Sequence, residues 1–175
     1  MFRGFNDFTP KIPETRKAPN TMTDLLANYV GGRWQHGTGK GSVLLDPVLG
    51  TELVRVDSTG IDLPAAFAHS RDVGGAALRA MTYAERAKLL VDVAAVLQAN
   101  RDAYYEISTA NSGTVKNDTA VDVDGAIYTI GQYAKWGTSL GNLRHLKDGD
   151  AVSLAKDGVF QSQHIQVPTR GVALF

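Results

Sequence analysis

The sequence predicts a chain of the α/β class, arranged as α+β over its 175 residues. Three observations lead to this prediction. Short strand-like segments fill residues 29–56, whereas apolar residues at helical spacing dominate residues 62–140. An Asp-Gly pair between two further strand-like runs, at residues 157–158, then predicts a hairpin.

The composition is that of an ordinary globular protein without a charge bias. Hydrophobic residues make up 43% and charged residues 21%, and 18 basic side chains balance 18 acidic ones. This neutrality gives no electrostatic argument for a nucleic-acid partner or an anionic membrane. The absence of cysteine excludes disulfides, cysteine-bound zinc and a thiol nucleophile within these residues. No apolar run approaches the roughly 20 residues that a membrane span needs.

Residues 1–21 are expected to form a disordered extension. Pro10, Pro13 and Pro19 disfavour a helix, and no apolar stretch of the kind found in signal peptides follows the basic residues. Met22 is a plausible natural start, because the ordered pattern begins directly after it. A short recognition tail is the alternative interpretation.

The next segment predicts a small antiparallel meander. A first short strand is expected over 29–34, a second over 42–45 and a third, with period-two alternation, over 53–56. A glycine-rich loop at 37–41 and a turn at 46–50 connect them.

Asp62 is predicted to cap the first helix, with Pro64 in its first turn. This helix is expected to run to about Val73, where Gly74 and Gly75 should break or kink it.

A capping box of Thr82 and Glu85 predicts the start of the second helix. Asn100 either ends this helix or interrupts it, and residues 111–113 end the run. Its expected apolar face consists of Leu89, Leu90, Val93, Val96 and Leu97.

A third helix is predicted over 118–140. Gly125, Gly131 and Gly137 lie six residues apart in it, and such glycines more often permit close packing than mark a site. Its expected buried surface consists of Val121, Ile127, Tyr128, Ile130, Tyr133 and Trp136.

Residues 151–155 and 159–167 flank the Asp157-Gly158 pair, which favours a type I′ turn because both central residues need a positive φ. A two-stranded ribbon is marginally stable alone, so it is expected to find a partner in the same or another chain. The apolar run 172–175 is typical of the opening of a strand buried in a parallel sheet. Because the chain stops inside that run, we expect it to be truncated.

Two motifs resemble chemical sites, but their details favour structural roles. The loop Gly37–Ser42 fails as a phosphate loop, because Gly41 separates Lys40 from Ser42 and no helix follows. Asp118, Asp122 and Asp124 suggest a cation site, but a carboxylate at a helix amino terminus needs no metal.

The remaining candidates carry no pattern that points to chemistry. Asn117–Thr119 matches a glycosylation sequon, without any indication of secretion. Tyr104, Tyr105, Tyr128 and Tyr133 are interpreted as packing aromatics. His36, His69, His145 and His164 lack the spacing of metal ligands, and of these His164 is the best candidate for an intersubunit contact.

The order of these elements resembles the amino-terminal part of the aldehyde dehydrogenase superfamily. Gly32 and Trp34, followed by the turn at 46–50, resemble that family's opening meander. Residues 77–87 are similar to the junction of its first two helices, the hairpin to its oligomerisation ribbon, and residues 169–175 to the entry of its first Rossmann strand.

Three shorter segments of the sequence indicate one branch of this superfamily. Residues 108–113, 117–118 and 121–125 resemble the ring-cleavage semialdehyde dehydrogenases of aerobic, CoA-linked aromatic catabolism. This branch acts on benzoate- or phenylacetate-derived CoA-thioester semialdehydes, and some members carry a fused domain like an enoyl-CoA hydratase. The resemblance covers Met22 to Phe175.

The resemblance implies a cytoplasmic, NADP- or NAD-dependent oxidoreductase that forms a homodimer. It divides the chain into an extension (1–21), a meander with helices of the cofactor domain (22–150), an oligomerisation hairpin (151–168) and a truncated Rossmann strand (169–175). In the family, the catalytic and cofactor-binding residues follow this last strand. We therefore assign no catalytic, cofactor-binding or metal-binding residue here, and expect no cofactor to bind these residues alone. The alternative is a stand-alone, non-catalytic interaction module.

Overall fold

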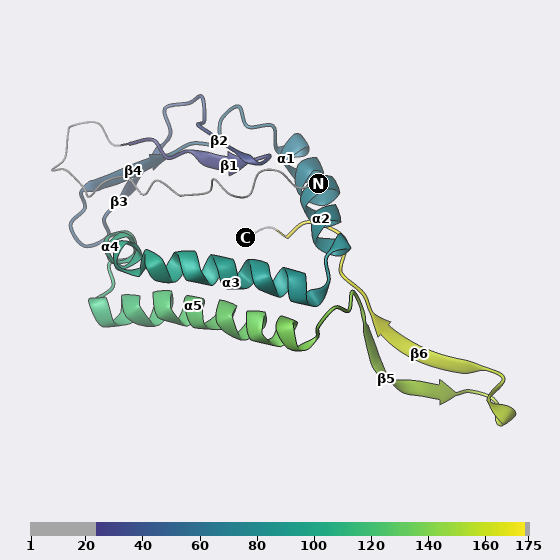
Figure 1. The fold of residues 1–175 in the computed structure, drawn as a ribbon. Coiled ribbons are helices and arrows are strands. Elements are labelled where there is room, and N and C mark those ends of the chain that lie inside the picture. Colours follow the sequence, from purple (N-terminus) through teal and green to yellow (C-terminus); the bar gives the residue numbers. More distant parts are fainter. Residues whose placement is uncertain (1–23, 174–175) are drawn as a thin grey trace.

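A computed structural model of the chain describes residues 24–173. Strands β1–β4 form one layer and the paired helices α3 and α5 form a second, while the β5–β6 hairpin projects from one end of the helices (Figure 1). The expected extension 1–21 lies outside the described residues, as do Leu174 and Phe175. The mixture of small strands and helices confirms the predicted fold class.

The first layer consists of two separate hairpins: β1 (Asn28–Val30) pairs with β2 (Arg33–Gln35), and β3 (Ser42–Leu45) with β4 (Glu52–Val56). The prediction of one strand over 29–34 is therefore wrong. Gly31 and Gly32 have φ values of 59° and 81°, which only glycine adopts without strain, and they turn the chain back on itself.

Asp62 caps helix α1 (Leu63–His69) as predicted, because its Oδ1 accepts the N–H of Ala65 at 2.9 Å. The sequence predicts a break or kink at Gly74 and Gly75, and the expectation of a break is wrong. The chain passes through a π-helical turn (Ser70–Gly74) directly into α2 (Gly75–Ala80), and the Gly75 N–H bonds to the Ser70 carbonyl. Glycine weakens a helix by about 1 kcal/mol but does not forbid one.

Helix α3 (Tyr83–Ala99) begins with the predicted capping box, in which the Thr82 hydroxyl accepts the Glu85 N–H and the Glu85 carboxylate accepts the Thr82 N–H. Asn100 has a non-helical φ of −112° and separates α3 from α4 (Arg101–Ser112). Gly113 ends α4 in the left-handed conformation, as predicted.

Helix α5 (Lys116–Ser139) lies along α3 (Figure 1). Gly137 of α5 approaches Ala87 of α3 closely. Among the described residues only Ala87, Ala134 and Thr119 are buried, so the core is a narrow seam between these helices. The predicted apolar faces of α3 and α5 are partly wrong. Each helix places a small residue, Ala87 in α3 and Gly137 in α5, against the other, so large side chains of the predicted faces point away from this contact. The exposed members are Val93, Val96, Val121, Tyr128, Tyr133 and Trp136.

The predicted hairpin is present with different limits. Strand β5 (Leu146–Ser153) starts before residue 151 and pairs with β6 (Gln161–Gln166). Asp157 and Gly158 have φ values of 70° and 67°, as a type I′ turn requires, but they lie in a wider loop closed by the Leu154 N–H on the Phe160 carbonyl. Residues 169–173 form no strand, because no described strand lies beside them to supply the pairing.

The helix seam predicts opposite effects for two glycines of α5. A Cβ at Gly137 would lie 3.0 Å from the Ala87 Cβ, whereas a Cβ at Gly125 meets nothing within 4 Å. Gly125→Ala should therefore stabilise the chain by up to about 1 kcal/mol through helix propensity. Gly137→Ala should destabilise it by about 1 kcal/mol or more through overpacking. Urea unfolding of both variants measures the difference, and equal stabilisation would contradict the close approach of α3 and α5.

Candidate functional site

The polar side chains with functional potential gather in three clusters. One surrounds Asp57 beside the glycine-rich loop, the second joins α4 to α5 through Arg101 and Asp124, and the third surrounds Thr119 at the α4–α5 turn. Each can be compared with what a catalytic or ligand-binding site would require.

Asp57 follows β4, and its carboxylate accepts a hydrogen bond from the backbone of the glycine-rich loop at 37–41. Its Oδ2 accepts the Gly39 N–H at 2.5 Å, and its Oδ1 accepts the Thr59 hydroxyl at 2.7 Å and the Thr59 N–H at 3.1 Å. The hydrogen bond from the Thr59 hydroxyl is the main cause that lowers the pKa of Asp57, and the backbone N–H groups add to it.

The same carboxylate explains the glycine spacing of the loop. A Cβ at Gly37 would collide with Asp57 Oδ2, and a Cβ at Gly39 would lie 2.8 Å from the Thr59 hydroxyl. The loop therefore binds an anion of its own chain, in the place where a phosphate loop would bind a ligand. Sequence reasoning missed Asp57, because nothing in the local pattern connects it with residues 37–41.

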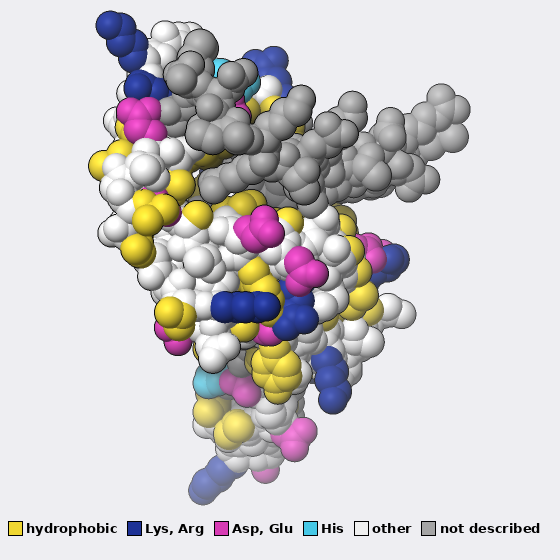
Figure 2. Space-filling model, turned by 90° about the vertical axis from the view of Figure 1, so that its left-hand side faces the viewer, with side chains coloured by type: hydrophobic (Ala, Val, Ile, Leu, Met, Phe, Trp, Pro, Cys, Tyr) yellow, Lys and Arg dark blue, Asp and Glu magenta, His cyan; other side chains and the backbone are white. Residues whose placement is uncertain are grey.

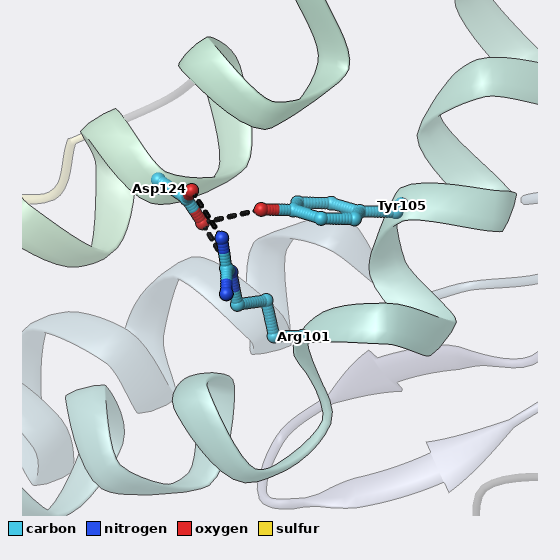
Figure 3. A network of polar contacts seen from close by, with 3 residues as sticks. All are labelled: Arg101, Tyr105 and Asp124. Carbon is cyan, nitrogen blue, oxygen red and sulfur yellow. Dashed lines mark hydrogen bonds and ion pairs between the residues drawn. The ribbon is translucent and has the colours of Figure 1, made fainter. Parts of the chain in front are cut away.

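Arg101, Tyr105 and Asp124 form the network that joins α4 to α5 (Figure 3). The Arg101 guanidinium donates from Nε and Nη2 to the two carboxylate oxygens of Asp124, each at 2.6 Å, and the Tyr105 hydroxyl donates to Asp124 Oδ1 at 2.8 Å. This bidentate geometry is the strong form of an arginine–carboxylate pair. The Asp124 carboxylate is therefore bound by its own chain, and among the described residues Asp118, Asp122 and Asp124 do not gather as metal ligands.

The ionisation of this network follows from its contacts. Arg101 holds the pKa of Asp124 below its usual range, with a smaller contribution from the Tyr105 hydroxyl. Desolvation is the first cause that raises the pKa of Tyr105, and the hydrogen bond to Asp124 acts in the same direction. A tyrosine in this state is a structural donor and a poor general base, which agrees with its predicted role as a packing aromatic.

The hydroxyl cluster at the α4–α5 turn has one consistent proton order. The Ser112 hydroxyl donates to the Ser108 carbonyl at 2.6 Å, because a carbonyl can only accept. Ser112 must then accept from Thr114 (2.9 Å), so Thr114 accepts from Thr119 (2.7 Å). Thr119 in turn accepts from Thr109 at 3.0 Å. This chain uses every hydroxyl proton and satisfies Thr119, which is fully buried.

The other candidate residues from the sequence do not gather into a site among the described residues. Over residues 24–173, no three His, Asp or Glu side chains come together as a metal site would require, and no helix is long and apolar enough to cross a membrane. In the possible sequon, Thr119 is buried and bonded to Thr109, whereas Asn117 is exposed. The histidines are scattered: His36 follows β2, His69 ends α1, His145 precedes β5 and His164 lies in β6.

Comparison with known proteins shows the family to which the chain belongs. Residues 34–160 match the family model described as "Aldehyde dehydrogenase family". Because this match covers well over half of the chain, the chain belongs to the aldehyde dehydrogenase family.

The most informative relative is a particular member of that family. The chain is 53% identical over 150 residues to the 3,4-dehydroadipyl-CoA semialdehyde dehydrogenase of Aromatoleum evansii. This alignment covers 86% of the chain and 29% of the relative, so the chain spans less than a third of that protein's length. The resemblance expected from the sequence is confirmed.

A solved structure supports the same fold. The NAD-dependent benzaldehyde dehydrogenase of Corynebacterium glutamicum superposes with a TM-score of 0.57 at 18% identity. The superposition covers 69% of this chain and 26% of the other. At this identity the likeness concerns the fold alone.

The glycine-rich loop at 37–41 does not fit the pyrophosphate of a dinucleotide cofactor. Such a cofactor needs a glycine-rich turn between a parallel strand and a helix, with free backbone N–H groups for the pyrophosphate. Here the glycine-rich loop joins β2 to β3, and Asp57 already occupies its Gly39 N–H. We therefore derive no catalytic step through a cofactor from these residues.

The Arg101–Asp124 pair predicts a pH-dependent contribution to stability. The pKa of Asp124 is lower in the folded state than in the unfolded state. The ion pair therefore contributes its full stabilisation at a pH above the pKa that Asp124 has in the unfolded state. This stabilisation is lost as the pH falls through the pKa that Asp124 has in the folded state. Asp124→Asn should therefore destabilise the chain at pH 7, and the deficit should vanish in strong acid. Urea unfolding from pH 7 to pH 2 checks this. Asp122→Asn, on the exposed face of α5, is the control, and a deficit of Asp124→Asn that persisted unchanged to pH 2 would contradict the assignment.

The proton order at Thr119 predicts unequal costs for two valine substitutions. Thr119→Val removes two hydrogen bonds from the buried centre and should cost about 1–3 kcal/mol. Thr109→Val removes only the terminal donor, while Thr119 still donates to Thr114, so the cost should be about half as large. Chemical denaturation measures both, with Thr119→Ser as the variant that keeps the hydroxyl. Equal losses at positions 109 and 119 would contradict the order.

Proposed function

We propose that the chain is the amino-terminal part of an NADP- or NAD-dependent aldehyde dehydrogenase that oxidises a CoA-thioester semialdehyde to the acid. The single observation that carries this proposal is the 53% identity to 3,4-dehydroadipyl-CoA semialdehyde dehydrogenase over 86% of the chain. The proposal includes a role in aerobic catabolism of benzoate or phenylacetate, a cytoplasmic location and a homodimer formed through the hairpin.

The exposed surface supports the proposal that this region belongs to a larger body. Large apolar side chains are exposed on every described layer, and Figure 2 shows them interspersed with charged groups on one face. Isolated exposed hydrophobic residues are normal, but side chains as large as Trp34, Trp136 and Phe160, each more than 60% exposed, are typical of surfaces that another part of a protein covers.

In this proposal the chain's own residues position the rest of the enzyme and carry out no chemical step. The capping box, the Asp57 loop and the Arg101–Asp124 pair fix the ends and the mutual angle of their elements. The sequence contains no cysteine, so no thiohemiacetal can form on it. The hydride acceptor of the complete enzyme is its nicotinamide cofactor.

A stand-alone interaction module is the second candidate. The observation that favours it is the hairpin, which extends beyond the helices (Figure 1) and has no strand of residues 24–173 beside either outer edge. Such a module should melt cooperatively and have a defined stoichiometry.

The proposed function predicts that the purified 175-residue chain forms no reduced cofactor. With a CoA-thioester semialdehyde and NADP⁺ or NAD⁺, the absorbance of the reduced nicotinamide should stay at the level of the blank. The protein encoded by the reading frame continued past the Phe175 codon, if it supplies the cysteine, should reduce the cofactor under the same conditions. Turnover by the 175-residue chain alone would overturn the assignment of the chemistry to other residues. A continued frame without activity would favour the module.

A further inference from the structure

The guanidinium of Arg86 has two buried nitrogens for which residues 24–173 supply no acceptor. Nε and Nη2 of Arg86 are closed to solvent, yet neither makes a hydrogen bond within that range. The ion pairs formed within the same range all involve other side chains. Buried polar groups in folded proteins are nearly always hydrogen-bonded, and a guanidinium carries a positive charge at neutral pH. This edge of Arg86 therefore requires an acceptor.

The first turn of α3 holds Arg86 in a fixed place. The Arg86 N–H donates to the Thr82 carbonyl at 3.1 Å, within the turn that Thr82 and Glu85 cap. The guanidinium lies over the Tyr83 ring, with its central carbon 4.5 Å from the ring centroid. The Leu143 carbonyl, beyond the end of α5, accepts the Tyr83 N–H at 2.8 Å and so anchors this ring. Stacking uses the face of a guanidinium, so its in-plane N–H groups remain to be satisfied.

The two nitrogens lie on one edge of the guanidinium, and this edge specifies the chemistry of the partner. The N–H groups of Nε and Nη2 point side by side in the plane of the group, which matches the two oxygens of a carboxylate. Arg101 uses the same two nitrogens to bind both oxygens of Asp124, each at 2.6 Å. Backbone carbonyls would satisfy the N–H groups without balancing the buried charge, whereas a carboxylate does both.

The acidic side chains on the same helix already have partners. The Glu85 carboxylate accepts the Thr82 N–H, and the Asp92 carboxylate accepts from Lys88. The chain covers only 29% of its curated relative, so most of a complete enzyme of that kind lies outside these residues. The Arg86 side chain as a whole is partly exposed, so a change of rotamer can turn its edge toward a neighbouring segment.

We propose that Arg86 binds the carboxylate of an aspartate or glutamate in the part of the enzyme beyond these 175 residues. This ion pair fixes the start of α3 against the larger body. The proposal rests on the proposed function, because it requires the longer enzyme of which the chain is the amino-terminal part. It adds the point of contact and the chemistry of the partner. Arg86 is a positioning residue in this arrangement and touches no substrate.

Removing the charge should not weaken the 175-residue chain alone. Arg86→Met removes a buried, unpaired charge and keeps a flexible side chain on the Tyr83 ring, so the urea midpoint should stay the same or rise. Arg101→Met is the matched control, because it leaves Asp124 without its partner and should lower the midpoint. An equal fall for both variants would overturn the proposal, since Arg86 would then already be bound within the chain.

The opposite effect is expected in a complete enzyme. A suitable protein is the Aromatoleum evansii dehydrogenase with its 150 matched residues replaced by those of this chain. In this chimera Arg86→Met should lower the melting temperature, because it leaves a carboxylate without its partner. Arg86→Lys, which keeps the charge, should recover part of the loss, and the neutral Arg86→Gln should not. Equal recovery by both would overturn the carboxylate, because an uncharged donor would then suffice.

A zero-length cross-link identifies the partner directly. In the Arg86→Lys chimera, a water-soluble carbodiimide adds to the carboxylate, and the amine at position 86 then displaces it. An amide forms, the amine proton and the carboxylate oxygen leave with the reagent as a urea, and nothing is oxidised or reduced. Mass spectrometry of a digest should show a peptide of α3 joined to an Asp or Glu outside the residues that this chain supplies. The chimera that keeps Arg86 is the control and should form no link from this position.

The outcomes separate this contact from the proposed function. A link from position 86 to the larger body, with destabilisation by Arg86→Met in the chimera alone, is the expected result. A link to a carboxylate of this chain, or no link at all, overturns the proposal. Oxidation of a CoA-thioester semialdehyde by the unsubstituted chimera tests the function separately. An inactive chimera that still gives the expected link overturns the proposed function and leaves the Arg86 contact standing.

Discussion

The close approach of α3 and α5 is the contact on which the rest of the structure depends. Gly137 lets α5 come within van der Waals distance of Ala87, and among the described residues the buried apolar side chains are those of Ala87 in α3 and Ala134 in α5. The end of α5 also completes the start of α3, because the carbonyls of Gly141 and Leu143 accept the N–H groups of Ala84 and Tyr83. The hairpin leaves directly after this junction, so its direction is set by the same contact.

Away from this seam, polar groups hold the structure together and leave little chemistry available. The Asp57 carboxylate is bound by the loop whose glycines it requires, and the Asp124 carboxylate by Arg101 and Tyr105. The hydroxyl protons around Thr119 are all used within one directed chain. These contacts position the neighbouring elements, which agrees with the proposal that this region supports an active site formed elsewhere.

The features that the sequence predicted well depend on neighbours a few residues apart. The Thr82–Glu85 box, the Asp62 cap and the positive φ of Asp157 are local, so a short stretch of sequence specifies them. Asp57 and the Arg101–Asp124 pair could not be predicted, because their partners lie 18 and 23 residues away and only the fold brings them together. The predicted apolar faces of α3 and α5 are partly wrong for a related reason, since small residues, and not the largest ones, are buried between these helices.

The two strands of the β5–β6 hairpin differ in the regularity and charge of their outer edges. Blocking an edge costs stability, because a bulge gives up regular pairing, so an edge that carries a bulge and charges is one that must stay single. The neighbouring strand β6 has neither protection, because the extra residues of the register shift lie in β5 and residues 161–166 carry no charged side chain. The bulge and the charges suit β5 to remain at the edge of a sheet. Strand β6 has a regular backbone over its described length, so it is the strand of the hairpin that can still accept a neighbour, from the same chain or from another.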